Sequence, residues 1–210
     1  ESAASKPEWS NLAVIRQGEY EGLEARSSDP HWKPDFGPLF DARSGATAVG
    51  ARPFLVAYNI NLNSREVRKA QKISAILREK GIARRDENNE PVRDEKGELV
   101  RDPGMFRCVK GMGWFIDEYD CAQMTFNMTD YTVSSPHALL DAARRLADEE
   151  GVVITGSELV GLIPLDAMLQ AGHHYLQRQG VCRGAPWNEV IEVAIRSMGL
   201  RDVSTFDPNH

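Results

Sequence analysis

The sequence predicts an α+β fold whose strands and helices follow one another in the order β-α-β-β-α-β. Three observations lead to this prediction. Two helical repeats of apolar residues, over 67–77 and 136–147, are separated by two strand-like segments. One of those segments, 122–131, alternates apolar and polar residues as a half-buried strand does. With 210 residues, 41% of them hydrophobic, the chain is long enough for a real core and for one to two domains.

The first strand is expected over 54–62, where a continuous apolar run passes into apolar–polar alternation. The following helix has Asn63 and Ser64 available as caps, and Gly81 ends it. A second strand, over 106–116, contains two glycines, which in a strand allow either close backbone approach or a bulge at a binding face. The predicted core residues of the first and third strands are Phe54, Val56, Tyr58, Ile60, Met124, Phe126 and Met128.

The second half of the chain continues the pattern. Ser134, Ser135 and Pro136 begin the second helix, which Gly151 closes. A short buried strand is expected over 152–155, followed by an apolar turn flanked by glycines. Two further helices are expected over 165–179 and 186–198.

This element order is that of the ferredoxin-like sandwich, a four-stranded antiparallel sheet with both helices on one face. The other face is then bare unless something covers it. Small polar residues occupy that face: Asn59 and Asn61 on the first strand, and Thr125, Asn127 and Thr129 on the third. Two interpretations stay open, an ordinary solvent-facing surface or the wall of a polar cavity that another domain closes.

Two other segments differ from this pattern. Residues 26–50 are rich in turn formers but carry four large apolar side chains, so we expect a loop ordered against another part of the protein. A short helix over 11–16, capped by Ser10, precedes it. Residues 84–104 form a charged insertion with an eight-residue pseudo-repeat, which we interpret as a solvated hairpin.

Composition excludes several classes of protein. The net charge of −6 argues against a nucleic-acid partner. No apolar run reaches the roughly 18 residues of a membrane span, and no secretory leader is evident. Cys108, Cys121 and Cys182 are too few for a disulfide framework, which favours the reducing cytoplasm. Because the first residue is Glu1 rather than methionine, we expect that processing or truncation removed the true start.

No familiar catalytic motif is present. The five histidines, His31, His137, His173, His174 and His210, show no metal-ligand spacing, and neither do the cysteines, so no metal is expected. A nucleophile motif and a dinucleotide-binding fingerprint are both missing.

Seven ordered sequence blocks nevertheless resemble the formiminotransferase domain family. They are Ile15-Arg16-Gln17-Gly18-Glu19-Tyr20-Glu21, Pro34-Asp35-Phe36-Gly37-Pro38, Gly45-Ala46-Thr47 with Gly50 to Leu55, Asn59-Ile60-Asn61-Leu62, Lys110-Gly111-x-Gly113-Trp114, Gln123-x-x-x-Asn127 and Gly156-Ser157-Glu158-Leu159-Val160-Gly161-Leu162-x-Pro164. The resemblance covers nearly the whole chain.

The resemblance implies a glutamate formimidoyltransferase, which transfers the formimino group of N-formimino-L-glutamate to tetrahydrofolate in histidine degradation. It implies two ferredoxin-like subdomains that face each other across a folate cavity, within a homodimer. Residues 1–46 would then be the tail end of the N-terminal subdomain, and 47–210 the C-terminal subdomain. The substrate-binding residues it implies, together with the polar sheet residues, are Gly37, Pro38, Leu39, Phe40, Asp41, Ala42, Arg43, Ser44, Gly45, Asn59, Asn61 and Asn127.

One departure from the family pattern is decisive for activity. The catalytic histidine of the family lies in a His-Pro-Arg-Met-Gly-like motif of the N-terminal subdomain, which this sequence lacks. We therefore assign no catalytic residue and expect the chain alone to be inactive. Arg43 or Arg52 would suit a glutamate carboxylate, or serve only at the surface. The alternative is a non-catalytic ferredoxin-like module that binds a small molecule or a partner.

Overall fold

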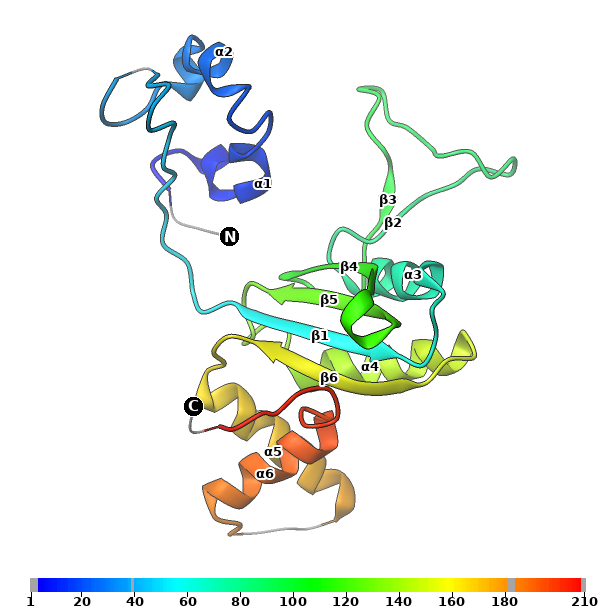
Figure 1. Cartoon of the computed structure of the whole chain (residues 1–210). Coiled ribbons are helices and arrows are strands. Elements are labelled where there is room, and N and C mark those ends of the chain that lie inside the picture. The colour runs from blue at the N-terminus through cyan, green and yellow to red at the C-terminus, as the bar shows by residue number, and fades with distance from the viewer. Residues whose placement is uncertain (1–3, 39, 181–183, 209–210) are drawn as a thin grey trace. The chain divides into compact units, whose positions relative to one another are not determined.

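The computed structural model describes residues 4–38, 40–180 and 184–208, and the chain divides into two compact units at Pro53. The second unit, from Phe54 onward, contains one four-stranded sheet in the order β4-β5-β1-β6 (Figure 1). Every neighbouring pair is antiparallel. The strands are β1 (Val56–Leu62), β4 (Val109–Ile116), β5 (Cys121–Met128) and β6 (Ile154–Val160). This topology confirms the ferredoxin-like prediction.

Two helices cover one face of this sheet. They are α3 (Val67–Leu77), which packs on β4 and β5, and α4 (Pro136–Glu149), which packs on α3 and β1. The core lies between the helices and the sheet, where Tyr58, Phe126 and Leu139 are fully buried. No helix among the described residues has the length and apolar character that crossing a bilayer requires.

All four strands have boundaries that differ from the sequence prediction: β4 begins at Val109 rather than 106, β5 ends at Met128 rather than 131, and β1 and β6 differ as follows. Phe54 is 78% exposed rather than in the core, because β1 begins at Val56, opposite the last residue of β5, Met128. The last strand is longer than expected, since the residues assigned to a glycine-flanked turn continue pairing with β1 as far as Val160. Glycine content favours a turn locally, but hydrogen bonding to a neighbouring strand extends β6.

The two glycines of β4 face the helix layer rather than a binding surface. A Cβ atom on Gly113 would lie 2.3 Å from the backbone nitrogen of Gln71 in α3. A Cβ atom on Gly111 would lie 2.4 Å from the ring of Phe126. Of the two interpretations of strand glycines, close approach of the backbone is the one that the structure shows.

The C-terminal helices form a third part of this unit. They are α5 (Leu165–Gln179) and α6 (Trp187–Met198), which pack against each other, and α5 also contacts α4. The end of α6 reaches β6, because the hydroxyl of Ser157 donates to the Met198 carbonyl at 2.6 Å and its backbone N–H donates to Gly199 at 3.0 Å. This contact covers the outer edge of β6.

The charged insertion is an arm of two similar hairpins. It leaves the sandwich through β2 (Ile82–Ala83) and returns through β3 (Arg101–Asp102). The pseudo-repeat has a structural counterpart. The Asp86 carboxylate accepts from the backbone N–H groups two and four residues further on, both at 2.9 Å. The Asp94 carboxylate accepts from the equivalent two N–H groups of the second repeat, also at 2.9 Å. The sequence predicted one solvated hairpin, and the repeat folds instead into two.

The first unit, up to Pro53, is built from short helical turns. They are η1 (Pro7–Ser10), α1 (Leu12–Ile15), α2 (Leu23–Ser27) and η2 (Pro30–Trp32). Trp9 and Trp32 stack with ring centroids 6.0 Å apart, and the Arg26 guanidinium lies 3.6 Å from the Trp32 centroid. The cap of α1 is Asn11 rather than Ser10, since its side chain accepts from the Ala13 N–H.

Candidate functional site

The face of the sheet opposite α3 and α4 carries the polar residues, and we call it the open face. Three rows of paired residues cross the strands on this face, at every second position of the register, because the residues between them point toward the helices. From β4 to β6 the rows are Trp114, Gln123, Asn61 and Gly156; Met112, Thr125, Asn59 and Glu158; and Lys110, Asn127, Ala57 and Val160.

A chain of side-chain hydrogen bonds links the first row. The indole N–H of Trp114 donates to the side-chain oxygen of Gln123 at 2.9 Å, and the Gln123 amide donates to the Asn61 oxygen at 2.7 Å. Gln123 is fully buried and Asn61 is 4% exposed. Buried amides are costly unless bonded, so this chain fixes the orientation of all three side chains.

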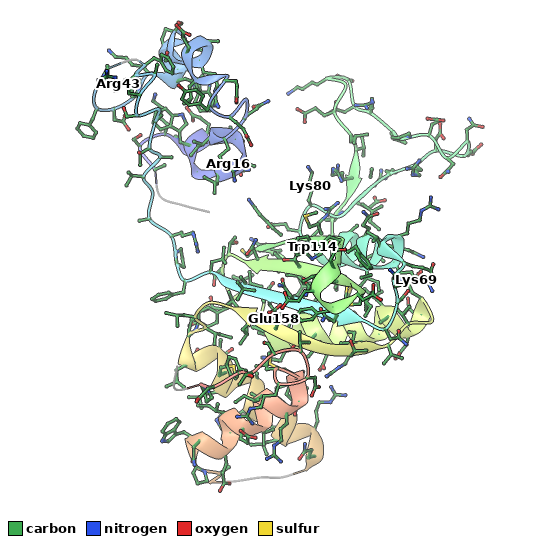
Figure 2. All side chains as sticks on the ribbon, in the orientation of Figure 1. Arg16, Arg43, Lys69, Lys80, Trp114 and Glu158 are labelled. Atoms are coloured by element: carbon green, nitrogen blue, oxygen red, sulfur yellow. The ribbon has the colours of Figure 1, made fainter. Side chains whose placement is uncertain are left out.

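A carboxylate ends the second row. Glu158 accepts from the Asn59 amide and from the Tyr119 hydroxyl, both at 3.4 Å. Tyr119 belongs to η3 (Asp117–Tyr119), the turn between β4 and β5, which therefore reaches across the sheet to β6. Burial, and next the charge of Glu158, raise the pKa of Tyr119, so its hydroxyl stays protonated and donates. Figure 2 labels Trp114 and Glu158, which mark the β4 and β6 sides of the face.

The structure brings the predicted amides together only in part. Asn59 and Asn61 lie side by side in the two bonded rows and are almost fully buried. Asn127 lies on the same face but is exposed. Thr129 falls beyond β5, where its hydroxyl and its backbone N–H both donate to the Cys108 carbonyl, so it is not part of the open face.

Sequence reasoning missed four residues of this site. Gln123 has the same alternation as Thr125 and Asn127, and this signal was available. Glu158 was hidden because its segment was assigned to a turn, in which alternation carries no meaning. Trp114 and Tyr119 carry no periodic signal that distinguishes them from ordinary core or turn residues.

A hollow of about 410 Å³ adjoins the end of the first row. Asn61 and Tyr119 line it, together with Thr155 and Arg65, and the Arg65 guanidinium lies 3.0 Å from the Asp120 carboxylate at this site. The hollow offers a polar ligand the side-chain amide of Asn61 and the guanidinium of Arg65, which is paired with Asp120.

The loop over 37–45 belongs to the first unit and is organised by Asp41. Its carboxylate accepts from the backbone N–H of Arg43 at 2.9 Å and from the Ser44 hydroxyl at 2.6 Å. The Ser44 bond, followed by the Arg43 bond, lowers the pKa of Asp41. The Tyr20 hydroxyl donates to the Ala42 carbonyl at 2.7 Å, so the loop is held by its own unit.

The other residues of the loop over 37–45 are placed as follows. The Phe40 ring lies 6.5 Å from the Tyr20 ring, centroid to centroid. Gly37 and Gly45 have φ angles of 85° and 65°, which favour glycine. Pro38 is exposed, and Leu39 lies outside the described residues.

None of the four strands that form the open face contains a histidine. The rings of His137 and His174 lie in the helix layer with centroids 4.7 Å apart and planes tilted by 32°, and His174 is 2.8 Å from the Asp141 carboxylate. Burial, and then His174, lower the pKa of His137 to about 4. His31 pairs with Glu8 in the first unit at 3.0 Å.

The other titratable candidates give no cluster. His173 is exposed, and His210 and Cys182 lie outside the described residues. Cys108 and Cys121 are free thiols. In the part of the chain that the structure describes, no three His, Cys, Asp or Glu side chains gather as metal ligands would.

Comparison with known proteins gives two family matches. The model of the formiminotransferase domain matches residues 57–210, and the model of its N-terminal subdomain matches residues 1–52. The first match thus includes all residues of the four strands except Val56, and the three rows of the open face.

Several curated relatives are similar over nearly the whole chain. Formimidoyltransferase-cyclodeaminase of Dictyostelium discoideum is 38% identical over 99% of this chain, and that of Mus musculus is 36% identical over 98%. Glutamate formimidoyltransferase of Thermoplasma acidophilum is 32% identical over 87% of it. The chain spans 36%, 35% and 54% of the length of these three proteins, respectively.

Proposed function

Because the chain belongs to the formiminotransferase domain family, we propose that its open face is the wall of a folate-binding cavity. The protein would be a glutamate formimidoyltransferase, which moves the formimino group of N-formimino-L-glutamate to tetrahydrofolate. The observation that carries this proposal is the bonded chain Trp114–Gln123–Asn61. A solvent-facing sheet has no need of buried, oriented amides, whereas a polar ligand requires them.

The composition of the open face suits tetrahydrofolate as co-substrate. Met112 and Trp114, 54% and 43% exposed, offer apolar surface to a flat ring. Asn59, Asn61 and Glu158 offer hydrogen-bonding groups beside them. An apolar surface with a few fixed polar groups is typical of small-molecule sites, and no metal enters the proposal.

The chemistry needs one proton-transfer group. The attacking folate nitrogen loses a proton and the departing glutamate nitrogen gains one, and a histidine with a pKa near neutral suits both steps. His137 and His174 are engaged in the helix layer, so we infer that this group comes from the rest of the N-terminal subdomain. The chain alone would then bind folate without turnover.

We propose the division of the chain on the same basis. Residues 1–46 would end the N-terminal subdomain, with the loop 37–45 contacting folate, and residues 47–210 would form the C-terminal subdomain. The proposal also includes a homodimer, located in the cytoplasm, that takes part in histidine degradation. The names of the relatives support the formimidoyl-transfer part of the proposal.

Calorimetric titration of the full-length gene product with a folate analogue tests the proposed function. Micromolar to low-millimolar binding is expected. Absence of binding at millimolar folate would refute it. The test variant is the double change Gln123→Leu with Asn61→Leu, which replaces the two bonded amides with apolar side chains, and we expect it to lose folate binding.

A non-catalytic binding module is the second candidate, and the absence of histidine from the four strands favours it. The gene upstream of Glu1 distinguishes the two. A His-Pro-Arg-Met-Gly-like segment in the same frame supports the enzyme, and a reading frame that begins near Glu1 supports the module.

A further inference from the structure

Glu158 is the one acidic side chain on the three rows of the open face, and all of these residues are described. It is partly buried, and among the described residues no Lys, Arg or His forms an ion pair with it. Its two partners, Asn59 and Tyr119, are both neutral. A carboxylate whose partners are neutral gains from a ligand that brings further N–H donors.

The two partners also fix how the carboxylate is turned. The Asn59 amide donates to one oxygen and the Tyr119 hydroxyl to the other, from two different elements, β1 and η3. Each carboxylate oxygen accepts two hydrogen bonds, so one acceptor position remains on each oxygen. Glu158 thus presents a planar, two-pronged acceptor at the end of the second row.

The groups that fit such an acceptor are planar and carry two N–H donors on one edge, as a guanidinium does. We propose that Glu158 binds an N–C–N donor edge of the substrate, an inference that rests on the proposed function. Both reactants contain one. The formimino group of N-formimino-L-glutamate is an amidine, cationic at neutral pH, and the pterin ring of folate carries an amino group beside a ring N–H.

The rest of the second row agrees with a flat ligand that starts at Glu158. From β6 to β4, the row passes Asn59 and Thr125 and ends at Met112, whose side chain is 54% exposed. At about 4.8 Å per strand, this row extends roughly 14 Å. A planar group anchored at Glu158 therefore lies over two small polar side chains and toward a thioether.

Glu158→Gln in the full-length gene product tests the inference. This change keeps the shape and the bond from Tyr119 but replaces the charge and one acceptor oxygen. The matched control is Glu149→Gln, the same substitution at an exposed site on α4. Calorimetry measures the affinity for 5-formyltetrahydrofolate, N-formimino-L-glutamate and N-formyl-L-glutamate, of which the last has an uncharged formyl amide in place of the cationic N–C–N group.

The outcomes separate the two sources of the donor edge. A loss of roughly 10- to 100-fold in folate affinity assigns Glu158 to the pterin ring. A similar loss for N-formimino-L-glutamate alone, with no remaining preference over N-formyl-L-glutamate, assigns it to the amidine. In both cases Glu149→Gln keeps wild-type affinity.

Failure of this inference differs from failure of the proposed function. If the wild type binds and Glu158→Gln stays within about twofold for both ligands, the role of Glu158 is overturned while the folate site stands. If the wild type binds neither ligand, the proposed function itself is refuted, and the inference with it.

Circular dichroism shows whether the Glu158→Gln variant folds. If it does not, the Tyr119→Phe variant is used for the same test. This change removes one donor that orients the carboxylate, and it leaves the charge in place. We expect a loss of roughly 2- to 10-fold for the same ligand. Unchanged affinity for both ligands would contradict the inference.

Discussion

Trp114 on β4 donates its indole N–H to the side-chain oxygen of Gln123 on the neighbouring strand β5, at 2.9 Å. Because Gln123 also donates to Asn61, one buried amide joins three strands of the sheet. The open face is therefore rigid in the first row before any ligand arrives, which favours binding of a ligand with fixed geometry.

This bonded row predicts coupled effects on stability. Gln123→Leu leaves Trp114 and Asn61 without their partner and is expected to lower the free energy of unfolding by about 1–3 kcal/mol. Trp114→Phe is expected to cost about 1 kcal/mol, and the double variant less than the sum. Urea unfolding measures all three, with Thr125→Val in the neighbouring row as control. Strictly additive effects would show that the two side chains are independent.

The glycines of β4 predict an order of destabilisation. Gly113→Ala places a methyl group against the backbone of α3, which cannot move without the helix, and about 3 kcal/mol of stability should be lost. Gly111→Ala meets the ring of Phe126, a side chain that can adjust, so the loss should be smaller. Denaturation midpoints of the two variants give the comparison. The reverse order would contradict a helix packed directly on β4.

His137 predicts a pH dependence of stability. Its pKa of about 4 in the folded protein lies below that of an unfolded imidazole, about 6.5. The unfolded chain therefore binds more protons between these values, and the free energy of unfolding falls as the pH drops from about 6.5 toward 4. His137→Gln removes this group, so the variant should lose less stability on acidification.

The measurement is urea unfolding at about pH 7, above the window, and at about pH 5, within it. The control is His173→Gln, the same change at an exposed position of α5, which should follow the wild type. His174 and Asp141, which adjoin His137, are present in all three proteins. Equal slopes for His137→Gln and the wild type would refute the assigned titration.

Changes in the two-hairpin arm are expected to affect the stability of the arm itself and to have little effect on the stability of the whole protein. The bonds that Asp86 and Asp94 accept lie within their own repeats, and the repeats are joined at their bases, where the Val100 N–H donates to the Val92 carbonyl at 2.9 Å. Asp86→Ala and Asp94→Ala should each lower the free energy of unfolding by less than about 1 kcal/mol, while hydrogen exchange speeds up in the altered hairpin alone. Exchange that rises in both hairpins after either change would show that the repeats fold as one unit.

Much of this fold was predictable because its signals are local. The spacing of apolar residues predicted α3 and α5 at nearly the observed bounds, since an amphipathic helix repeats within its own segment. β6 was shortened in the prediction because its extension past Gly156 depends on pairing with β1, which no local pattern reports. Glu158 was lost from the site for the same reason.

The sequence by itself determined the order of strands and helices and placed Asn59 and Asn61 on one face, because alternation along a strand needs no neighbour. Only the tertiary structure decided that these amides are buried and bonded, and that Gln123, Trp114, Glu158 and Tyr119 join them. Those contacts cross from one strand or turn to another, from β4 to β1 and from η3 to β6. The physical reason is that a hydrogen bond is set by distance in space, which the register of the sheet fixes and the linear sequence does not.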